Sequence, residues 1–358
     1  MKKLLLLLLS CVALLAITAT AAPPRFAEVK PEDALIFPRD FGAHPDYRTE
    51  WWYATGWLQT PDGKPLGFQL TFFRAATEHD PANPSRFAPK QLIIAHAALS
   101  DPALGRLLHD QKAARAGFDL AYAKTGNTDV KLQDWRFVRD EKGVYHASIP
   151  ATDFTLTLDL APTQPIMPQG EGGYSRKGPL PSQASHYFSE PQLKVSGSVT
   201  RNGKPMAVTG TAWLDREWST SYLAPGASGW DWMGINLDDG SALMAFRIRA
   251  KDGSTLWSHA TLRDAAGRLT QFAQQDIRFT PLRTWRSPHT DASYPVAIAL
   301  DTGGIRWTLE PLQDDQELDS RASTGSVYWE GAVRVTRDGK PAGRGYLELT
   351  GYVSPLKL

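Results

Sequence analysis

The sequence contains one cysteine, Cys11, and it lies in an apolar run near the N-terminus. A single thiol cannot form an intramolecular disulfide, and loss of the N-terminal segment would leave no thiolate for catalysis. The eight histidines show no His-x-His or His-Glu-x-x-His spacing. We therefore expect no metal site and no cofactor.

The chain also lacks an excess of either charge. It has 39 Lys and Arg against 38 Asp and Glu, a formal net charge of +1. A nucleic-acid-binding protein needs a basic surface, so we expect no nucleic-acid partner. A Gly-x-Ser-x-Gly nucleophile motif is missing as well, because the segment 173–175 (Gly-Tyr-Ser) lacks the second glycine and a strand–helix setting. This argues against a nucleophilic hydrolase.

The N-terminus has the pattern of an export signal. Lys2 and Lys3 precede an apolar run over 4–17, and Ala19-Thr20-Ala21 forms a small-x-small cleavage site. We predict a signal peptide at 1–21 and a periplasmic or secreted mature protein. The run is too short for a membrane span, and Cys11 comes too early in it for lipoprotein anchoring.

The mature sequence has the pattern of an all-β protein. Apolar and polar residues alternate with a period of two over 68–72, 155–160 and 346–352. Asp-Gly and Asn-Gly pairs at 62–63, 202–203, 239–240, 252–253 and 338–339 indicate hairpin turns. The best helical candidate, 111–117, is short. Size and hairpin order favour an up-and-down barrel wide enough to hold one small ligand.

The same blocks occur twice in the same order. His96-Ala-Ala-Leu-Ser-Asp101 is echoed by His259-Ala-Thr-Leu-Arg-Asp264, Asp134-Trp-Arg-Phe137 by Asp276-Ile-Arg-Phe279, and Val199-Thr-Arg-Asn-Gly-Lys-Pro205 by Val335-Thr-Arg-Asp-Gly-Lys-Pro341. We therefore predict two tandem antiparallel β-barrels related by internal duplication, over 22–220 and 221–358, with the link at 219–229. Because both copies carry the histidine, His96 and His259 are interpreted first as fold devices.

The first group of candidate site residues includes Arg74, whose charge we predict to be buried. Arg74 shares a strand face with Phe68 and Phe72, so if that face is the barrel interior, the guanidinium needs a partner. Glu50 is our first choice, and the pair either closes the barrel or anchors a ligand's polar head. The ligand-binding candidates in this half are Glu50, Trp51, Tyr53, Arg74 and His96.

The second candidate block is 213–218, Trp-Leu-Asp-Arg-Glu-Trp. Asp215 and Glu217 share a strand face, and burial and mutual repulsion can keep one of two such carboxyl groups protonated for general acid catalysis. We predict that both acids, with Trp213, Trp218 and Trp232, line or flank a cavity at the domain junction. The alternative is a charged strand end. The segments 186–188 and 328–330 are interpreted as core packing, and the Gly-rich loop 162–185 as a functional loop or a surface excursion.

These blocks resemble those of the AttH-like, carotenoid 1,2-hydratase-related family of exported proteins. The resemblance rests on 44–53, 67–74, 213–218, 229–232, 328–331 and 345–352 and covers nearly all of the mature chain. It implies two lipocalin-like barrels side by side. Relatives include isoprenoid hydratases, fungal cyclases that use a pocket between the domains, and proteins often labelled secreted hydrolases. The hydratase branch carries His-Asn-Trp where this chain has Arg216-Glu217-Trp218, which argues against carotenoid hydration.

Two function classes remain open. The first is a carrier of a long hydrophobic ligand, a lipid or isoprenoid, which the resemblance also links to ABC-type transporter components. The second is a cofactor-free enzyme, a hydro-lyase or cyclase acting on such a molecule, with Asp215 or Glu217 as the general acid.

Overall fold

The computed structural model describes residues 26–80 and 82–356. The predicted signal peptide at 1–21, with Cys11, lies outside the described residues. The fold is all-β, with two short 3-10 turns, η1 (Arg39–Phe41) and η2 (Gln274–Asp276). In the described ranges, no helix is long and apolar enough to cross a membrane.

The strands form two antiparallel sheets. The first contains β1 (Thr49–Gln59), β2 (Pro65–Ala76), β3 (Gln91–Ser100), β4 (Leu107–Arg115), β5 (Ala121–Ala123), β6 (Asp129–Leu132), β7 (Trp135–Arg139), β8 (Tyr145–Pro150), β9 (Thr155–Ala161), β10 (Met167–Pro168), β11 (Tyr174–Arg176), β12 (Ala184–Arg201) and β13 (Lys204–Ser221). The second contains β14 (Ala227–Leu237), β15 (Ala242–Ala250), β16 (Thr255–Arg263), β17 (Leu269–Phe272), β18 (Ile277–Arg286), β19 (Ser293–Thr302), β20 (Ile305–Pro311), β21 (Glu317–Ser320), β22 (Ser326–Arg337) and β23 (Lys340–Leu349).

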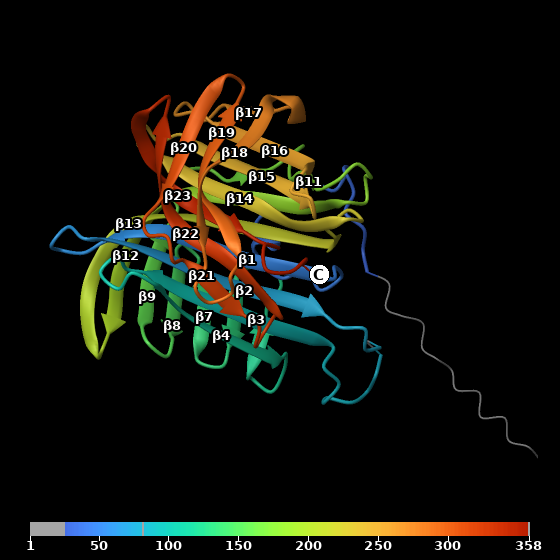
Figure 1. The fold of residues 1–358 in the computed structure, drawn as a ribbon. Coiled ribbons are helices and arrows are strands. Elements are labelled where there is room, and N and C mark those ends of the chain that lie inside the picture. The colour runs from blue at the N-terminus through green and yellow to red at the C-terminus, as the bar shows by residue number, and fades with distance from the viewer. Residues whose placement is uncertain (1–25, 81, 357–358) are drawn as a thin grey trace, which may run out of the picture.

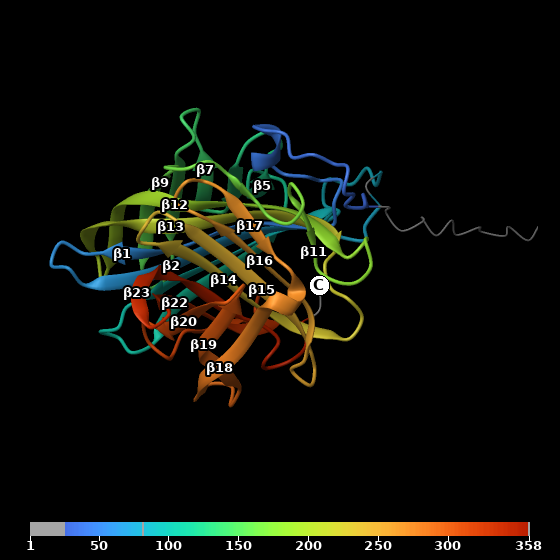
Figure 2. The same cartoon turned by 90° about the horizontal axis from the view of Figure 1, so that it is seen from above.

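Both sheets follow the same plan of strand pairing, which confirms the duplication. The first runs β4-β3-β2-β1-β13-β12-β9-β8-β7-β6-β5 and the second β17-β16-β15-β14-β23-β22-β20-β19-β18. In each, four hairpin-linked strands come first and a long hairpin returns to pair with the first strand. The path beyond that hairpin has five strands, β5 to β9, in the first sheet and three, β18 to β20, in the second. Each sheet curls so that β3 and β4 approach β5 and β6, and β16 approaches β18. Figures 1 and 2 show the two curved sheets packed against each other.

The sequence echoes fall on equivalent strands. His96 lies on β3 and His259 on β16, while 134–137 and 276–279 lead into β7 and β18. The Asn-Gly and Asp-Gly pairs at 202–203 and 338–339 turn the β12–β13 and β22–β23 hairpins with positive φ at all four residues, as a type I′ turn requires. The helical candidate 111–117 is wrong, because 107–115 pairs with β3 as the edge strand β4.

The interior of each barrel is filled with side chains. In the first barrel, Trp52, Phe68 and Phe72 have no exposed surface and pack in one apolar cluster. In the second, Trp307 and Trp329 belong to a corresponding cluster. The barrels are therefore packed cores, and the expectation of a barrel wide enough to hold a ligand is not met by the interiors.

A third apolar cluster lies between the barrels. It combines Tyr53, Trp57 and Trp213 of the first barrel with Trp232 and Tyr346 of the second. The Trp57 indole N–H donates to the Gly345 carbonyl at 2.9 Å across this interface. A Cβ at Gly67 would come within 2.7 Å of the Ala332 side chain. The two sheets thus approach as closely as a glycine permits.

The first barrel contains a buried ion cluster on the Glu50 carboxylate, as the sequence predicted for Arg74. Glu50 and Arg74 have no exposed surface and form a direct ion pair. The Arg216 guanidinium binds the other Glu50 oxygen at 3.0 Å, and the His44 backbone N–H donates to the same carboxylate. Burial alone would raise the pKa of Glu50, but the His44 hydrogen bond and the two guanidinium charges lower it below its ordinary 4.5.

The second barrel repeats this arrangement with different residues. Asp231 pairs across the strands with Arg247, as Glu50 pairs with Arg74. Its carboxylate binds Arg247 at 2.7 Å and Arg249 at 2.8 Å. A buried acid held by two arginines is therefore a feature of the duplicated fold, which favours the structural interpretation of the Glu50–Arg74 pair.

Arg74→Met is expected to lower the free energy of unfolding by about 3–5 kcal/mol, because it leaves the Glu50 carboxylate buried with less compensation. Since the pKa of Glu50 is lowered on folding, this contribution is present above about pH 4.5 and lost as the pH falls. Urea unfolding at neutral pH measures it. Arg283→Met, at a surface pair with Asp314, is the control and should cost less than about 1 kcal/mol. Equal stability of Arg74→Met and wild type would contradict the assignment.

Candidate functional site: a cavity between the barrels

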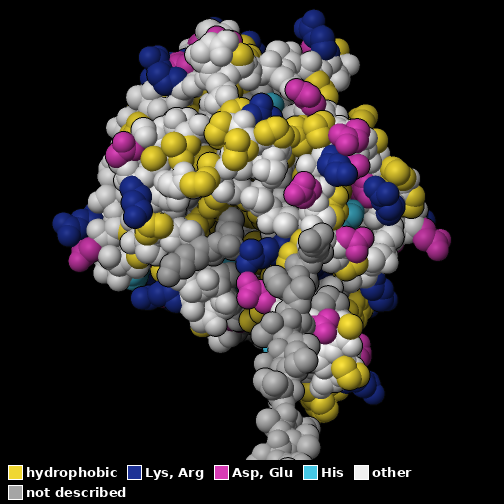
Figure 3. Space-filling model, turned by 90° about the vertical axis from the view of Figure 1, so that its right-hand side faces the viewer, with side chains coloured by type: hydrophobic (Ala, Val, Ile, Leu, Met, Phe, Trp, Pro, Cys, Tyr) yellow, Lys and Arg dark blue, Asp and Glu magenta, His cyan; other side chains and the backbone are white. Residues whose placement is uncertain are grey.

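A cavity of about 360 Å³ lies between the two barrels. Its first wall is the outer face of β1, β2, β3 and β13, and its second wall is the outer face of β14, β15, β22 and β23. The lining comprises Thr49, Glu50, Trp51, Tyr53, Thr71, Phe73, Arg74, Ala75, Ile94, His96, Lys177, Tyr187, Asp215, Glu217, Tyr222, Leu223, Trp230, Trp232, Phe246, Ile248, Ser323, Thr324, Ser326, Tyr328, Glu330, Glu348, Thr350 and Leu356. On the face where the C-terminal end lies, hydrophobic side chains gather around a hollow (Figure 3).

Strand alternation decides which side chains reach the cavity. Along β1, Trp51 and Tyr53 line it, while Trp52 packs inside the first barrel. The cross-strand partners of Trp51 and Tyr53 on β13 are Glu217 and Asp215, which therefore share that outer face. Pairing thus places an aromatic residue beside each carboxyl group.

Asp215 lies at the centre of a hydrogen-bond network. Its carboxyl oxygens accept from the Trp213 indole N–H at 2.7 Å, the Ser189 hydroxyl at 2.6 Å and the Tyr187 hydroxyl at 2.7 Å. Tyr187 in turn accepts from the Trp232 indole N–H at 2.9 Å, which links the two barrels. Burial raises the pKa of Asp215 to about 7, against the three hydrogen bonds, which lower it. Near neutral pH this carboxyl group is poised between acid and base.

The Gly-rich loop 162–185 supplies the cation that pairs with the Glu217 carboxylate. The Lys177 Nζ lies 3.0 Å from a Glu217 oxygen and 4.1 Å from the centre of the Phe246 ring. The Ser185 hydroxyl donates to the same carboxylate at 2.5 Å. The loop 162–185 therefore has a part in the site, because it brings the Lys177 ammonium group into the cavity wall.

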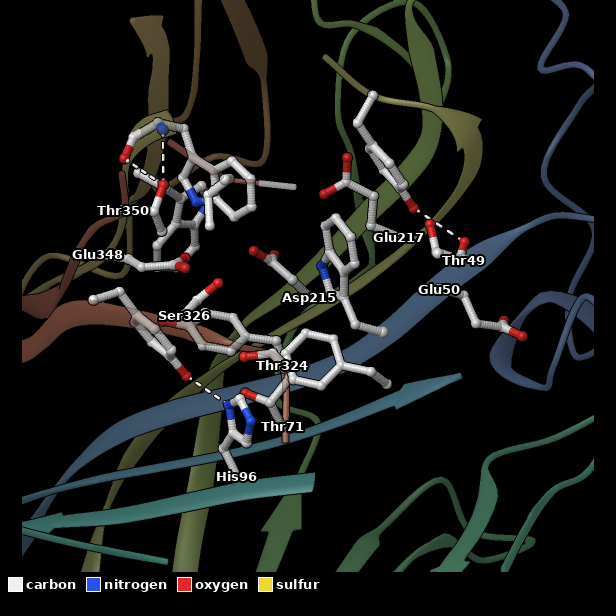
Figure 4. Close-up of a pocket in the computed structure, with 18 of the residues that line it drawn as sticks. Thr49, Glu50, Thr71, His96, Asp215, Glu217, Thr324, Ser326, Glu348 and Thr350 are labelled. Atoms are coloured by element: carbon white, nitrogen blue, oxygen red, sulfur yellow. Dashed lines mark hydrogen bonds between the residues drawn. The ribbon is translucent and has the colours of Figure 1, made fainter. Parts of the chain in front are cut away.

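The second barrel contributes two more carboxyl groups. Glu330 of β22 and Glu348 of β23 are direct cross-strand partners, so their side chains leave adjacent positions on one face. Burial and the Glu348 charge raise the pKa of Glu330 well above its ordinary value. Burial, with the charges of Asp215 and Glu217, raises the pKa of Glu348 to about 8. Figure 4 shows the Asp215 and Glu348 carboxyl groups directed into the same space, whereas that of Glu50 points away.

His96 joins the barrels at the other end of the cavity. Its Nδ1 lies 2.8 Å from the Tyr328 hydroxyl and its Nε2 lies 2.9 Å from the Ser323 hydroxyl, both in the second half of the chain. Burial lowers the pKa of His96 to about 3, so the ring is neutral at physiological pH. Because both ring nitrogens of His96 contact hydroxyl groups of the second half, this neutral imidazole holds the second wall of the cavity against the first.

The sequence-predicted residues fall into four groups. Trp51, Tyr53, His96, Asp215, Glu217 and Trp232 line the cavity. Glu50 and Arg74 border it, but their charged groups bind each other in the first barrel. Trp213 lies behind Asp215 and binds it. The placement of Trp218 at the junction is wrong, because residues 214, 216 and 218 face the barrel interior, where Trp218 stacks on His44.

Among the lining residues that the sequence did not point to as site residues are Lys177, Tyr187, Tyr328, Glu330 and Glu348. The sequence predicts core packing for 186–188 and 328–330, and all six residues are buried. Phe188 and Trp329 lie inside the barrels, whereas Tyr187 and Tyr328 belong to apolar clusters between them and also line the cavity. The alternation over 346–352 correctly predicts that Glu348 lies on the other face of its strand from Leu347 and Leu349. Only the packing of the second barrel on the first shows that this polar face is enclosed.

Arg216, which occupies the position of the hydratase-branch histidine, does not line the cavity. Its guanidinium lies over the Trp52 ring at 3.9 Å and binds Glu50 inside the first barrel. Within the part of the chain that the structure describes, no group of three His, Cys, Asp or Glu side chains could hold a metal ion.

Fold and site together define an all-β double-barrel protein with an aromatic, acid-lined cavity between its barrels. The chain belongs to the AttH-like family, whose sequence profile matches residues 28–352. A crystal structure of a protein described as AttH from Nitrosomonas europaea is 65% identical, with a TM-score of 0.87, over 92% of this chain and 100% of that chain. The predicted family resemblance is thereby confirmed.

More distant structures share the fold. Kievitone hydratase from Nectria haematococca is 16% identical with a TM-score of 0.69, over 93% of this chain and 98% of that chain. CghA in complex with Sch210972 is 13% identical with a TM-score of 0.53, over 92% and 98%. At these identities the likeness concerns the fold alone. A comparison with curated protein sequences gives no match.

Asp215→Asn is expected to change how stability depends on pH. Between its ordinary pKa of 3.8 and about 7, Asp215 keeps a proton in the folded protein that the unfolded chain has released. Its contribution to stability therefore falls as the pH rises through this window. Urea unfolding at several pH values should show Asp215→Asn gaining stability relative to wild type from about pH 4 to about pH 7. Asp153→Asn, at an exposed position, should track wild type, and a parallel curve for Asp215→Asn would contradict the burial argument.

Proposed function

We propose that the protein binds an elongated, mainly apolar small molecule in the cavity between its barrels. The observation that carries the proposal is the lining: aromatic and aliphatic side chains form most of the wall, and a few polar groups converge on it. An enclosed apolar pocket with a few placed polar groups is the usual form of a small-molecule site. The barrel interiors are filled with side chains, which supports a ligand site between the barrels and not inside either one.

The aromatic wall suits an apolar chain. Tyr53 and Trp232 pack edge to face with ring centres 5.2 Å apart, and Phe246 is the cross-strand partner of Trp232. Large flat side chains bury much ligand surface with little loss of their own conformational freedom. With its predicted export, the protein would act as a lipid or isoprenoid carrier outside the cytoplasm.

Trp232→Ala is expected to weaken binding of a pyrene-labelled decanol by about tenfold or more, since it removes an aromatic surface from the centre of the wall. Pyrene fluorescence titration measures the Kd. Trp285→Ala is the matched control, because Trp285 packs on the core of the second barrel and does not line the cavity. Equal Kd values for the three proteins, or no saturable binding by wild type, would contradict the proposal.

One observation favours a second function, acid-catalysed addition of water to an alkene. Asp215 faces an apolar cavity with a pKa of about 7, so a protonated carboxyl group is available at neutral pH. Its proton would form the new C–H bond, water would form the C–O bond, and a proton from that water would return to the Asp215 carboxylate. Neighbouring rings such as Trp232 would stabilise the cationic intermediate.

Asp215→Asn separates the two functions. If the protein is a hydratase, the variant should lose roughly 10²–10⁴-fold in turnover while still binding the ligand. Incubation of bound isoprenoid alkenes in isotopically labelled water, followed by mass spectrometry, detects the added oxygen. Ser198→Ala, distant from the lining, is the control. Turnover by Asp215→Asn at the wild-type rate would exclude this residue as the acid.

A further inference from the structure

The cavity wall carries more carboxyl groups than the chain neutralises. Its acidic members are Glu50, Asp215, Glu217, Glu330 and Glu348, and its cationic members are Arg74 and Lys177. Both cations are engaged, Arg74 with Glu50 and Lys177 with Glu217. Asp215 accepts three hydrogen bonds from neighbouring side chains. The surplus is therefore concentrated on Glu330 and Glu348.

Glu330 is the exceptional member of this set. It is 1% exposed, and neither of its carboxyl oxygens accepts a hydrogen bond of good geometry, although the Tyr53 and Tyr328 hydroxyl groups lie close enough to lower its pKa in part. A buried polar group without a partner costs free energy that the rest of the fold must offset. Within residues 26–80 and 82–356, no Lys, Arg or His forms an ion pair with Glu330 or Glu348. An unsatisfied buried carboxyl group in a cavity wall is the complement of a ligand that donates hydrogen bonds.

The surroundings of the pair match a cation. Glu348 has Trp232 as its cross-strand partner on one side and Glu330 on the other. Tyr53, Trp230 and Trp232 line the same space. Aromatic faces next to carboxylates are the chemistry that binds ammonium groups. A cation also relieves the repulsion between two carboxyl groups at adjacent cross-strand positions.

The chain shows this chemistry in the wall of the same cavity with its own side chain. Lys177 extends its ammonium group onto Glu217, with the ring centres of Tyr187 and Phe246 at 4.6 Å and 4.1 Å. The Glu330–Glu348 pair offers the same combination of acid and aromatic rings without an internal cation. Lys177 already occupies the site at Glu217, whereas the site at Glu330 and Glu348 is open to the cation of a ligand.

We propose that the ligand is an amphiphile with a protonated amine head, which binds between Glu330 and Glu348 while its apolar chain lies along the aromatic wall. This inference rests on the proposed binding function. It names the head group, which the apolar lining alone does not. Burial raises the pKa of both carboxyl groups, so without a ligand the pair keeps protons that an ammonium group would replace.

Three probes of equal chain length test the head group: decylamine, decanol and decanoic acid, titrated calorimetrically at pH 7.5. Wild type should bind decylamine about tenfold or more tightly than decanol, because charge-assisted hydrogen bonds are stronger than neutral ones. Decanoic acid, ionised at this pH, should bind most weakly. Glu330→Gln and Glu348→Gln should each bring the decylamine-to-decanol affinity ratio close to one. Glu141→Gln, an exposed acid, should keep the wild-type ratio.

The outcomes are distinguishable. Failure of all three probes to bind would overturn the proposed function and this inference with it. Binding of all three with no preference for the amine, or a preference that survives both substitutions, would overturn the inference and leave the binding function standing. Thermal unfolding of each variant verifies that it folds. Because the two glutamates are replaced separately, loss of fold in one variant still leaves the other to decide.

Discussion

Both faces of β1 and β13 are buried, and the site depends on this double burial. One face of each strand packs inside the first barrel, with Trp52 and Leu214 in its core. The other face, with Tyr53 and Asp215, is covered by the second barrel. An antiparallel sheet ordinarily has one face in water. Here the duplication supplies a second sheet, so polar groups that would be solvated in a single barrel are enclosed.

Enclosure accounts for the chemistry of the cavity. The Glu50 carboxylate remains charged because two guanidinium groups and His44 surround it, and its counterpart Asp231 shows that the fold uses this solution twice. Asp215 and Glu348 have no such partners, and burial raises the pKa of each toward or above neutrality. Ion pairs therefore satisfy the acids inside the barrels, while the cavity wall also carries carboxyl groups without a cationic partner.

Local pattern was enough to predict the barrels, their duplication and the Glu50–Arg74 pair, because strand alternation and ordered echoes are local properties. Local pattern failed to predict the cavity residues whose placement depends on how the two sheets pack against each other. Alternation separates Trp218 from Asp215, yet proximity in sequence led to grouping them at the junction. Glu330 and Glu348 gave no signal of their own, since a polar outer face looks solvated until a second barrel covers it. Their pairing also depends on a register shift between Val335 and Thr336 in the β22–β23 hairpin, which the Asp-Gly turn at 338–339 does not predict.

The central claim is that the ligand lies between the barrels and not inside either one. A crystal structure with a long-chain bromoalkyl ligand, located by the anomalous signal of its bromine, tests this most directly. We expect bromine density among Tyr53, Trp232 and Phe246, with Trp52 and Trp307 unmoved in the two barrel cores. Density inside a barrel, or at the outer surface alone under saturating ligand, would contradict it.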